Sequence, residues 1–175
     1  MRRLLSPLCL ALWLIAPNAL AETLYHLELL VFRQAPPLLA SQPPGEDWSA
    51  GVAPIAKLDQ RTAVLRDQAA QLGEHLGPVL LQQAWQQRLG EGASRVRFGA
   101  GPTRDGHQTV EGILSLEQGR SRYPQLTLEL WVNHFDAEGQ LQSSERLRQK
   151  QRLLPGQLTY IDHPSLGALV RARLP

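Results

Sequence analysis

Four basic side chains recur at every second position near the end of the chain, and they are the residues whose spacing most clearly suggests chemistry. They are Arg146, Arg148, Lys150 and Arg152. In a β-strand, residues two apart share one face at a spacing of about 6 to 7 Å, so the four would form one basic stripe. In a helix they would scatter. Guanidinium groups bind carboxylates in a bidentate manner, so the stripe predicts binding to a carboxylate-rich polymer or to an acidic protein face.

Two interpretations of this basic stripe stay open. Pro155 and Gly156 close the segment as a turn, which favours an extended strand, and not a helix, for residues 144–154. Arg120 and Arg122 lie in a predicted hairpin turn and would extend the stripe if the two strands are neighbours. The simpler interpretation is a solvated edge strand whose cations block aggregation. The sharper one is a binding surface for an anionic ligand.

An aromatic residue, Trp131, alternates with the apolar Leu130 and points to the opposite face of its predicted strand. If exposed beside the cations, its ring would contact sugar rings. Packing beneath a loop explains the same residue equally well.

Patterns typical of catalysis are missing from the sequence. It has no nucleophile elbow, no glycine-rich phosphate loop and no paired histidines at zinc-binding spacing. The close acid and imidazole pairs are His134 with Asp136, and Asp162 with His163. Each lies in a predicted turn, where Asp commonly bonds its own backbone. We therefore predict a protein without enzymatic activity, metal or cofactor, and a hydrolase that uses Asp162 and His163 is the weakest alternative.

The segment that organises the chain is residues 110–133, two runs of alternating apolar residues joined by a turn. In a hairpin, one side would collect the residues Gly112, Leu114, Leu116, Leu126, Leu128, Leu130 and Val132. A lone hairpin is marginal in water, so other elements must cover its leucine face.

Helices are predicted to provide that cover. Residues 62–89 have apolar positions at helical spacing, with Gly77 and Pro78 separating two helices, and Trp85 is expected in the core. Further strands are predicted at residues 25–33, as a central strand, and at 95–98, 158–161 and 169–174. The order of elements predicts an α+β domain, with an antiparallel sheet of about five or six strands and helices packed on one face.

A Pro-rich loop is predicted at residues 34–58. It is long for a compact domain, so it is either mobile or a contact loop, and the mobile or loosely packed form is favoured. Trp48 is the residue that could pin it down.

The first 21 residues have a cationic start, a short apolar run and small residues at the end, which is typical of a secretory signal peptide. Residues 22–175 then form a single domain, without cysteine because Cys9 leaves with the signal, and with no integral membrane span. The full chain has 18 Lys and Arg against 16 Asp and Glu. Removing Arg2 and Arg3 makes the mature chain formally neutral, which argues against a nucleic-acid-binding protein.

Three blocks of the sequence carry a resemblance to a known family. They are residues 25–33, which read YHLELLVFR, 78–85, which read PVLLQQAW, and 158–170, which read LTYIDHPSLGALV. Together they resemble the CsiV family of exported peptidoglycan-binding proteins. The resemblance implies a periplasmic location, peptidoglycan binding and no enzymatic activity. It also implies an accessory role in cell-wall synthesis, through an outer-membrane lipoprotein that activates a class A penicillin-binding protein. The alternative is a periplasmic protein adaptor that pairs through its edge strand or its Pro-rich loop and does not bind the wall polymer.

Overall fold

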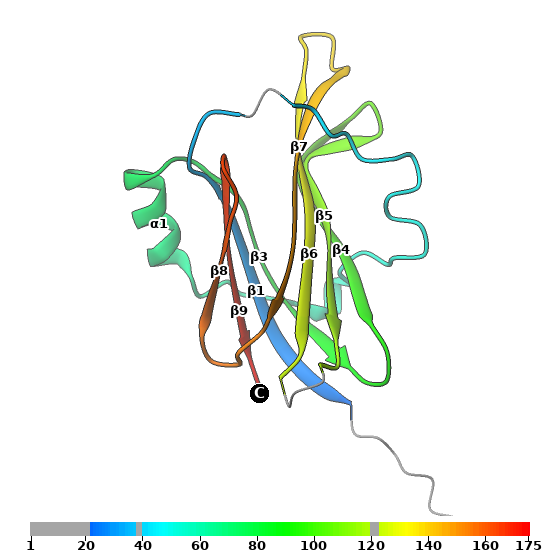
Figure 1. The fold of residues 1–175 in the computed structure, drawn as a ribbon, viewed down its shortest axis with the longest axis vertical. Coiled ribbons are helices and arrows are strands. Elements are labelled where there is room, and N and C mark those ends of the chain that lie inside the picture. Colours follow the sequence, from blue (N-terminus) through cyan, green and yellow to red (C-terminus); the bar gives the residue numbers. More distant parts are fainter. Residues whose placement is uncertain (1–21, 38–39, 120–122) are drawn as a thin grey trace, which may run out of the picture.

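The computed structural model describes residues 22–37, 40–119 and 123–175, and in them the chain forms two antiparallel sheets packed face to face (Figure 1). The five-stranded sheet has the order β2-β3-β1-β9-β8, and the four-stranded sheet has the order β4-β5-β6-β7. The predicted α+β arrangement is therefore wrong: in the described residues the leucine face of the hairpin is covered by a second sheet instead of by helices.

The strands of the five-stranded sheet are β1 (Thr23–Arg33), β2 (Gln60–Arg61), β3 (Val79–Leu89), β8 (Leu158–Asp162) and β9 (Leu166–Arg173). Those of the four-stranded sheet are β4 (Ser94–Arg104), β5 (His107–Glu117), β6 (Gln125–Phe135) and β7 (Leu141–Arg152). One α-helix, α1 (Arg66–His75), and one 3-10 turn, η2 (Lys57–Asp59), complete the described elements. β1 is central, as predicted.

The second predicted helix is strand β3. Its apolar residues Leu81, Trp85 and Leu89 are buried in the core between the sheets. A spacing of four residues fits both a helix of period 3.6 and a strand of period two, so the pattern alone does not separate the two. The predicted core position of Trp85 is confirmed. The first predicted helix is α1, which lies on the outer side of the five-stranded sheet, with Ala69 and Leu72 packed on a small cluster around Phe32.

The predicted hairpin of residues 110–133 is confirmed as β5 and β6. Leu114 faces Leu128 and Leu116 faces Leu126 across the pair. These leucines share one core with Leu27, Leu29 and other residues of the opposite sheet. Because the two leucine faces bury each other, the residues of opposite parity on β5 and β6 point to the outer face of the four-stranded sheet.

The long connection between β1 and α1 wraps around the sandwich. It leaves the end of β1, reaches the outer side of the four-stranded sheet and returns to α1 on the outer side of the other sheet (Figure 1). It hydrogen-bonds to both edge strands of the four-stranded sheet: Gln42 N donates to Ser144 O at 2.8 Å, and Arg97 N donates to Ala53 O at 2.9 Å. The Pro-rich loop therefore packs on the sheet, which supports the contact-loop interpretation and not the mobile or loosely packed form that the sequence favoured.

A glycine in the core gives a test of this sandwich packing. A Cβ on Gly112 would lie 2.4 Å from the carbonyl oxygen of Glu129 and 2.7 Å from the ring of Phe98. Gly112→Ala should lower the free energy of unfolding by about 1 to 3 kcal/mol, measured by urea denaturation. Gly73→Ala, in α1 with nothing near its added methyl group, is the control and should be neutral or stabilise by about 0.5 to 1 kcal/mol. Equal effects at both positions would contradict the packing.

Candidate binding surface on the four-stranded sheet

The outer face of the four-stranded sheet carries the basic stripe predicted from the sequence. β7 is extended, and on it Arg146 lies opposite Trp131, Arg148 opposite Glu129 and Lys150 opposite Thr127. The four cations therefore lie on one side of one strand, as predicted. Arg120 and Arg122 lie outside the described residues.

Carboxylates of the neighbouring strands partly neutralise this stripe. Glu129 accepts hydrogen bonds from the guanidinium of Arg146, and its other oxygen lies 3.8 Å from Nε of Arg148. Lys150 Nζ donates to Glu117 at 3.0 Å. The side chain of Arg146 is only 33% exposed, whereas those of Arg148 and Lys150 are 63% and 54% exposed. Pairs exposed to this degree are weak in water, so Arg148 and Lys150 stay open to a competing anion, while Arg146 is committed to Glu129.

A shallow depression of about 670 Å³ occupies this face beside the exposed cations. Its walls carry both signs of charge: Arg148 and Lys150 from β7, Glu117 and Glu129 from β5 and β6, and Arg95 from β4. Arg152 is exposed at the end of β7. Arg95 was not predicted to belong to this surface, although its parity on a short alternating strand was the available signal.

Trp131 does not contribute an open ring to this surface. It is only 5% exposed, because Trp48 of the Pro-rich loop packs edge-on against it with ring centroids 5.4 Å apart. The guanidinium of Arg146 lies 5.7 Å from the Trp131 ring centre. Trp131 is therefore withdrawn as a sugar-stacking residue, and packing under the loop, which the sequence left open, is what the structure shows. Trp48 pins the loop as expected.

Buried polar groups beside Trp131 also hold the Pro-rich loop on the outer face of the four-stranded sheet. Glu111 on β5 lies directly opposite Trp131, and the ring of His107 bonds the carboxylate of Glu111 at 2.7 Å. Asn133 Nδ2 donates to the same carboxylate at 2.8 Å, and Ser144 Oγ donates to Asn133 Oδ1 at 2.6 Å. Ser144 N then donates to Ser41 Oγ of the loop at 2.9 Å. The upper part of the outer face is therefore a covered polar layer, and the lower part is the open depression.

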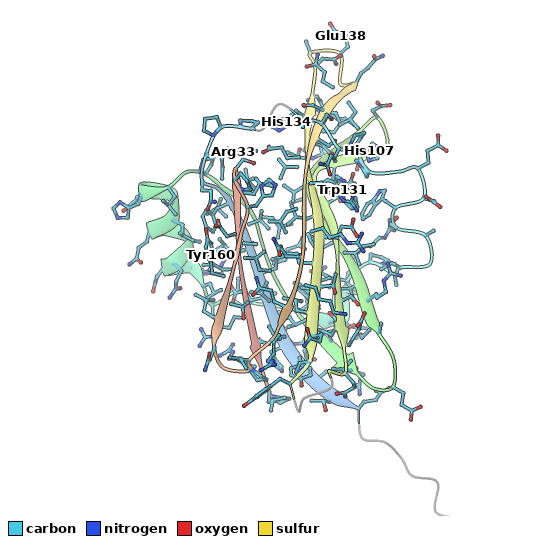
Figure 2. All side chains as sticks on the ribbon, viewed as in Figure 1. Arg33, His107, Trp131, His134, Glu138 and Tyr160 are labelled. Carbon is cyan, nitrogen blue, oxygen red and sulfur yellow. The ribbon has the colours of Figure 1, made fainter. Side chains whose placement is uncertain are left out.

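A buried ionic cluster joins the two sheets at one end of the sandwich, where Arg33 and His134 lie (Figure 2). Glu145 of β7 pairs with Arg33 of β1 at 2.6 Å, bonds His134 Nε2 at 2.9 Å and accepts the hydroxyl of Ser165. Burial raises the pKa of Glu145. The hydrogen bonds from Arg33, Ser165 and His134, with the charge of Arg33, outweigh burial and lower the pKa to about 2.

The two acid and imidazole pairs considered for catalysis are engaged elsewhere. Asp162 accepts hydrogen bonds from Gln34 and Tyr160, which lower its pKa, and burial lowers the pKa of His163. His163 Nδ1 faces Ser165, but Ser165 is fully buried and its hydroxyl donates to Glu145.

Asp136 accepts the backbone N–H of Gln140 in a turn, as predicted for turn chemistry. In the described part of the chain, no group of three acidic, histidine or cysteine residues is placed to hold a metal ion. No described helix is both long and apolar enough to cross a membrane.

A comparison with known protein families matches the sequence over most of this fold. Residues 46–174 match the family described as "Peptidoglycan-binding protein, CsiV". The chain belongs to the CsiV family. The match contains strands β2 to β9 and helix α1, and it includes the depression and both edge strands of the four-stranded sheet. Two of the three blocks that carried the resemblance lie inside it, while residues 25–33 precede it. No curated protein and no solved structure matches the chain.

The ionic cluster predicts a defined dependence of stability on pH. Because the folded pKa of Glu145 is about 2 and its ordinary value is 4.5, its stabilisation is complete above pH 4.5 and is lost as the pH falls towards 2. Glu145→Gln should lower the free energy of unfolding at pH 7 by about 3 kcal/mol, and the difference from wild type should shrink between pH 4.5 and 2.

Urea denaturation at a series of pH values measures both effects. Glu91→Gln, an exposed carboxylate in the turn between β3 and β4, is the matched control and should follow the wild-type curve. A Glu145→Gln curve parallel to wild type at all pH values would contradict the assignment.

Proposed function

We propose that this CsiV-family protein is a non-catalytic, periplasmic peptidoglycan-binding protein, and that the depression on the four-stranded sheet is its wall-binding surface. The family match supports peptidoglycan as the ligand. The observation that carries the choice of surface is the set of exposed cations along β7, with Arg95 across the depression.

The chemistry of the depression suits this polymer. Peptidoglycan stem peptides present carboxylates, which arginine and lysine bind through charge-assisted hydrogen bonds. Glu117 and Glu129 alternate with the cations, so the surface also offers partners to ligand amino groups. Because each contact is exposed, binding is weak per contact and falls with salt, and a polymer gains affinity when it engages several cations of the row at once.

The proposal that the protein is non-catalytic is supported by the candidate acid, base and nucleophile side chains, which are engaged in contacts within the fold. Glu145, Asp162 and His163 are hydrogen-bonded within the fold, and Ser165 is fully buried. None of these four residues lines the depression on the four-stranded sheet or the other large hollow of the described residues.

The location and the cellular role are also part of the proposal. The signal-like pattern of residues 1–21 supports export to the periplasm. There the protein would act as an accessory factor of cell-wall synthesis, together with an outer-membrane lipoprotein activator of a class A penicillin-binding protein.

A second candidate function, the protein adaptor, is favoured by one observation. β7 pairs only with β6, and the outward backbone groups of residues 146, 148, 150 and 152 have no partner among the described residues. Such an edge can accept a strand from another protein. Arg148→Pro removes one outward N–H at an edge position that tolerates proline, and Arg148→Gln is its matched control. Loss of crosslinking to a partner with proline alone would favour the adaptor.

Co-sedimentation with purified sacculi tests the wall-binding surface. Replacing Arg148, Lys150 and Arg152 together by Gln should weaken binding about tenfold or more, because the three exposed cations of the β7 row are lost, two of them from the wall of the depression, and added salt should weaken wild-type binding. The matched control replaces Lys57, Arg88 and Arg173, three exposed cations outside the depression, by Gln.

The outcomes of this experiment separate the ligand from the surface. Failure of the wild-type protein to sediment would overturn peptidoglycan binding. Wild-type sedimentation with equal binding of both triple variants would overturn the choice of surface. Thermal melting of each variant checks that the fold is retained.

A further inference from the structure

A second hollow of the molecule is a cleft along the side of the sandwich, about 910 Å³ in volume. β3 and β4 follow each other in the chain but belong to different sheets. The connection between β1 and α1 attaches to both strands: residues 53–55 hydrogen-bond to Arg97 on β4, and β2 pairs with Trp85 and Ala84 on β3. The cleft lies between these attachments, apart from the depression on the outer face, with which it shares no lining residue.

The cleft has the lining of a site for an amide-rich ligand with a carboxylate. Its side chains include the amides of Gln82, Gln83 and Gln108. Glutamine side chains pair with peptide and acetamide groups, since each amide offers both a donor and an acceptor. The volume is in the range of small-molecule sites, so a short peptide or one amino sugar with its peptide fits.

Two arginines in this cleft are free to bind an anion. Within the described residues, the guanidinium groups of Arg66 and Arg97 make no ion pair and no hydrogen bond, and both side chains line the cleft. Two acidic residues also line it: Glu111 is held by His107 and Asn133, and Glu46 is exposed. The balance of charge suits one or two carboxylates and disfavours a polyanion.

One polar atom of the cleft lining lacks its hydrogen bond in the free protein. Gln83 Nε2 donates to Gly99 O at 2.8 Å, but Gln83 Oε1 is buried and has no partner among the described residues. A buried acceptor without a donor is costly, so such groups commonly mark a missing ligand or water. A ligand N–H that reaches Gln83, with a small rotation of the amide, would supply the bond.

We infer that the side cleft binds the stem-peptide end of a peptidoglycan fragment, with a ligand carboxylate on Arg66 and Arg97 and ligand amides on the glutamines. This inference rests on the proposed function and deepens it. The outer depression binds the polymer through several exposed charged side chains, and the cleft binds one peptide end. Trp48 lines the cleft while packed on Trp131, so it gives a supported apolar wall to the ligand.

Isothermal titration of the full mature chain with a soluble muramoyl tripeptide tests the cleft. The double variant Arg66→Gln with Arg97→Gln should bind the tripeptide at least about tenfold more weakly, since two charge-assisted contacts are lost. The double variant Arg88→Gln with Arg173→Gln has the same change of charge outside the cleft and should bind like wild type. Gln83→Leu, which removes the unpaired acceptor, should also weaken binding.

The same titration distinguishes this inference from the proposed function. A wild-type protein that sediments with sacculi but does not bind the tripeptide would overturn the cleft and leave the outer surface intact. Equal affinity for a neutral N-acetylglucosamine oligomer would overturn recognition of the peptide end. Unchanged tripeptide binding in the arginine double variant, with its melting temperature retained, would overturn the assigned residues.

Discussion

The mutual burial of two leucine-rich faces is the constraint on which the rest of this molecule depends. Leu114, Leu128 and Leu130 of the four-stranded sheet share one apolar core with Leu29 and Trp85 of the five-stranded sheet. Neither sheet can leave this face in water, because removing apolar area from water is the main favourable term in folding. Once these faces are fixed inward, alternation along each strand fixes the charged residues outward, and the candidate surface follows from the core.

The buried polar groups then set which parts of the surface stay open. The Arg33 and Glu145 pair joins the two sheets at one end, and the layer of Glu111, Asn133 and Ser144 seats the Pro-rich loop over the upper outer face. The lower outer face carries no such seat and stays open as the charged depression. The loop thus leaves two separate hollows, one charged and shallow on the sheet, the other amide-rich at the side.

The family assignment and the geometry of the structure supply different parts of the functional conclusion. The CsiV match gives a class of ligand and no residues, while the structure gives surfaces with no ligand attached. The exposed cations of β7 connect the two, because a carboxylate-bearing polymer is a ligand that such a row can bind. Their partial pairing with Glu117 and Glu129 matters for this connection, since it makes the surface one of mixed charge instead of a simple basic patch.

The sequence by itself determined the local features of this protein. Strict alternation predicted the β5 and β6 hairpin, the extended form of β7 and the shared side of its cations, because strand parity is a property of consecutive residues. The sequence did not determine what covers the leucine face. Leu81, Trp85 and Leu89 fit a helix and a strand equally, and only packing against the opposite sheet selects the strand. The burial of Trp131 under Trp48, the pairing of Arg146 with Glu129 and the side cleft were also decided by the tertiary structure alone. Each joins residues that are distant in the chain, and their contact depends on a register and a layer order that no local pattern encodes.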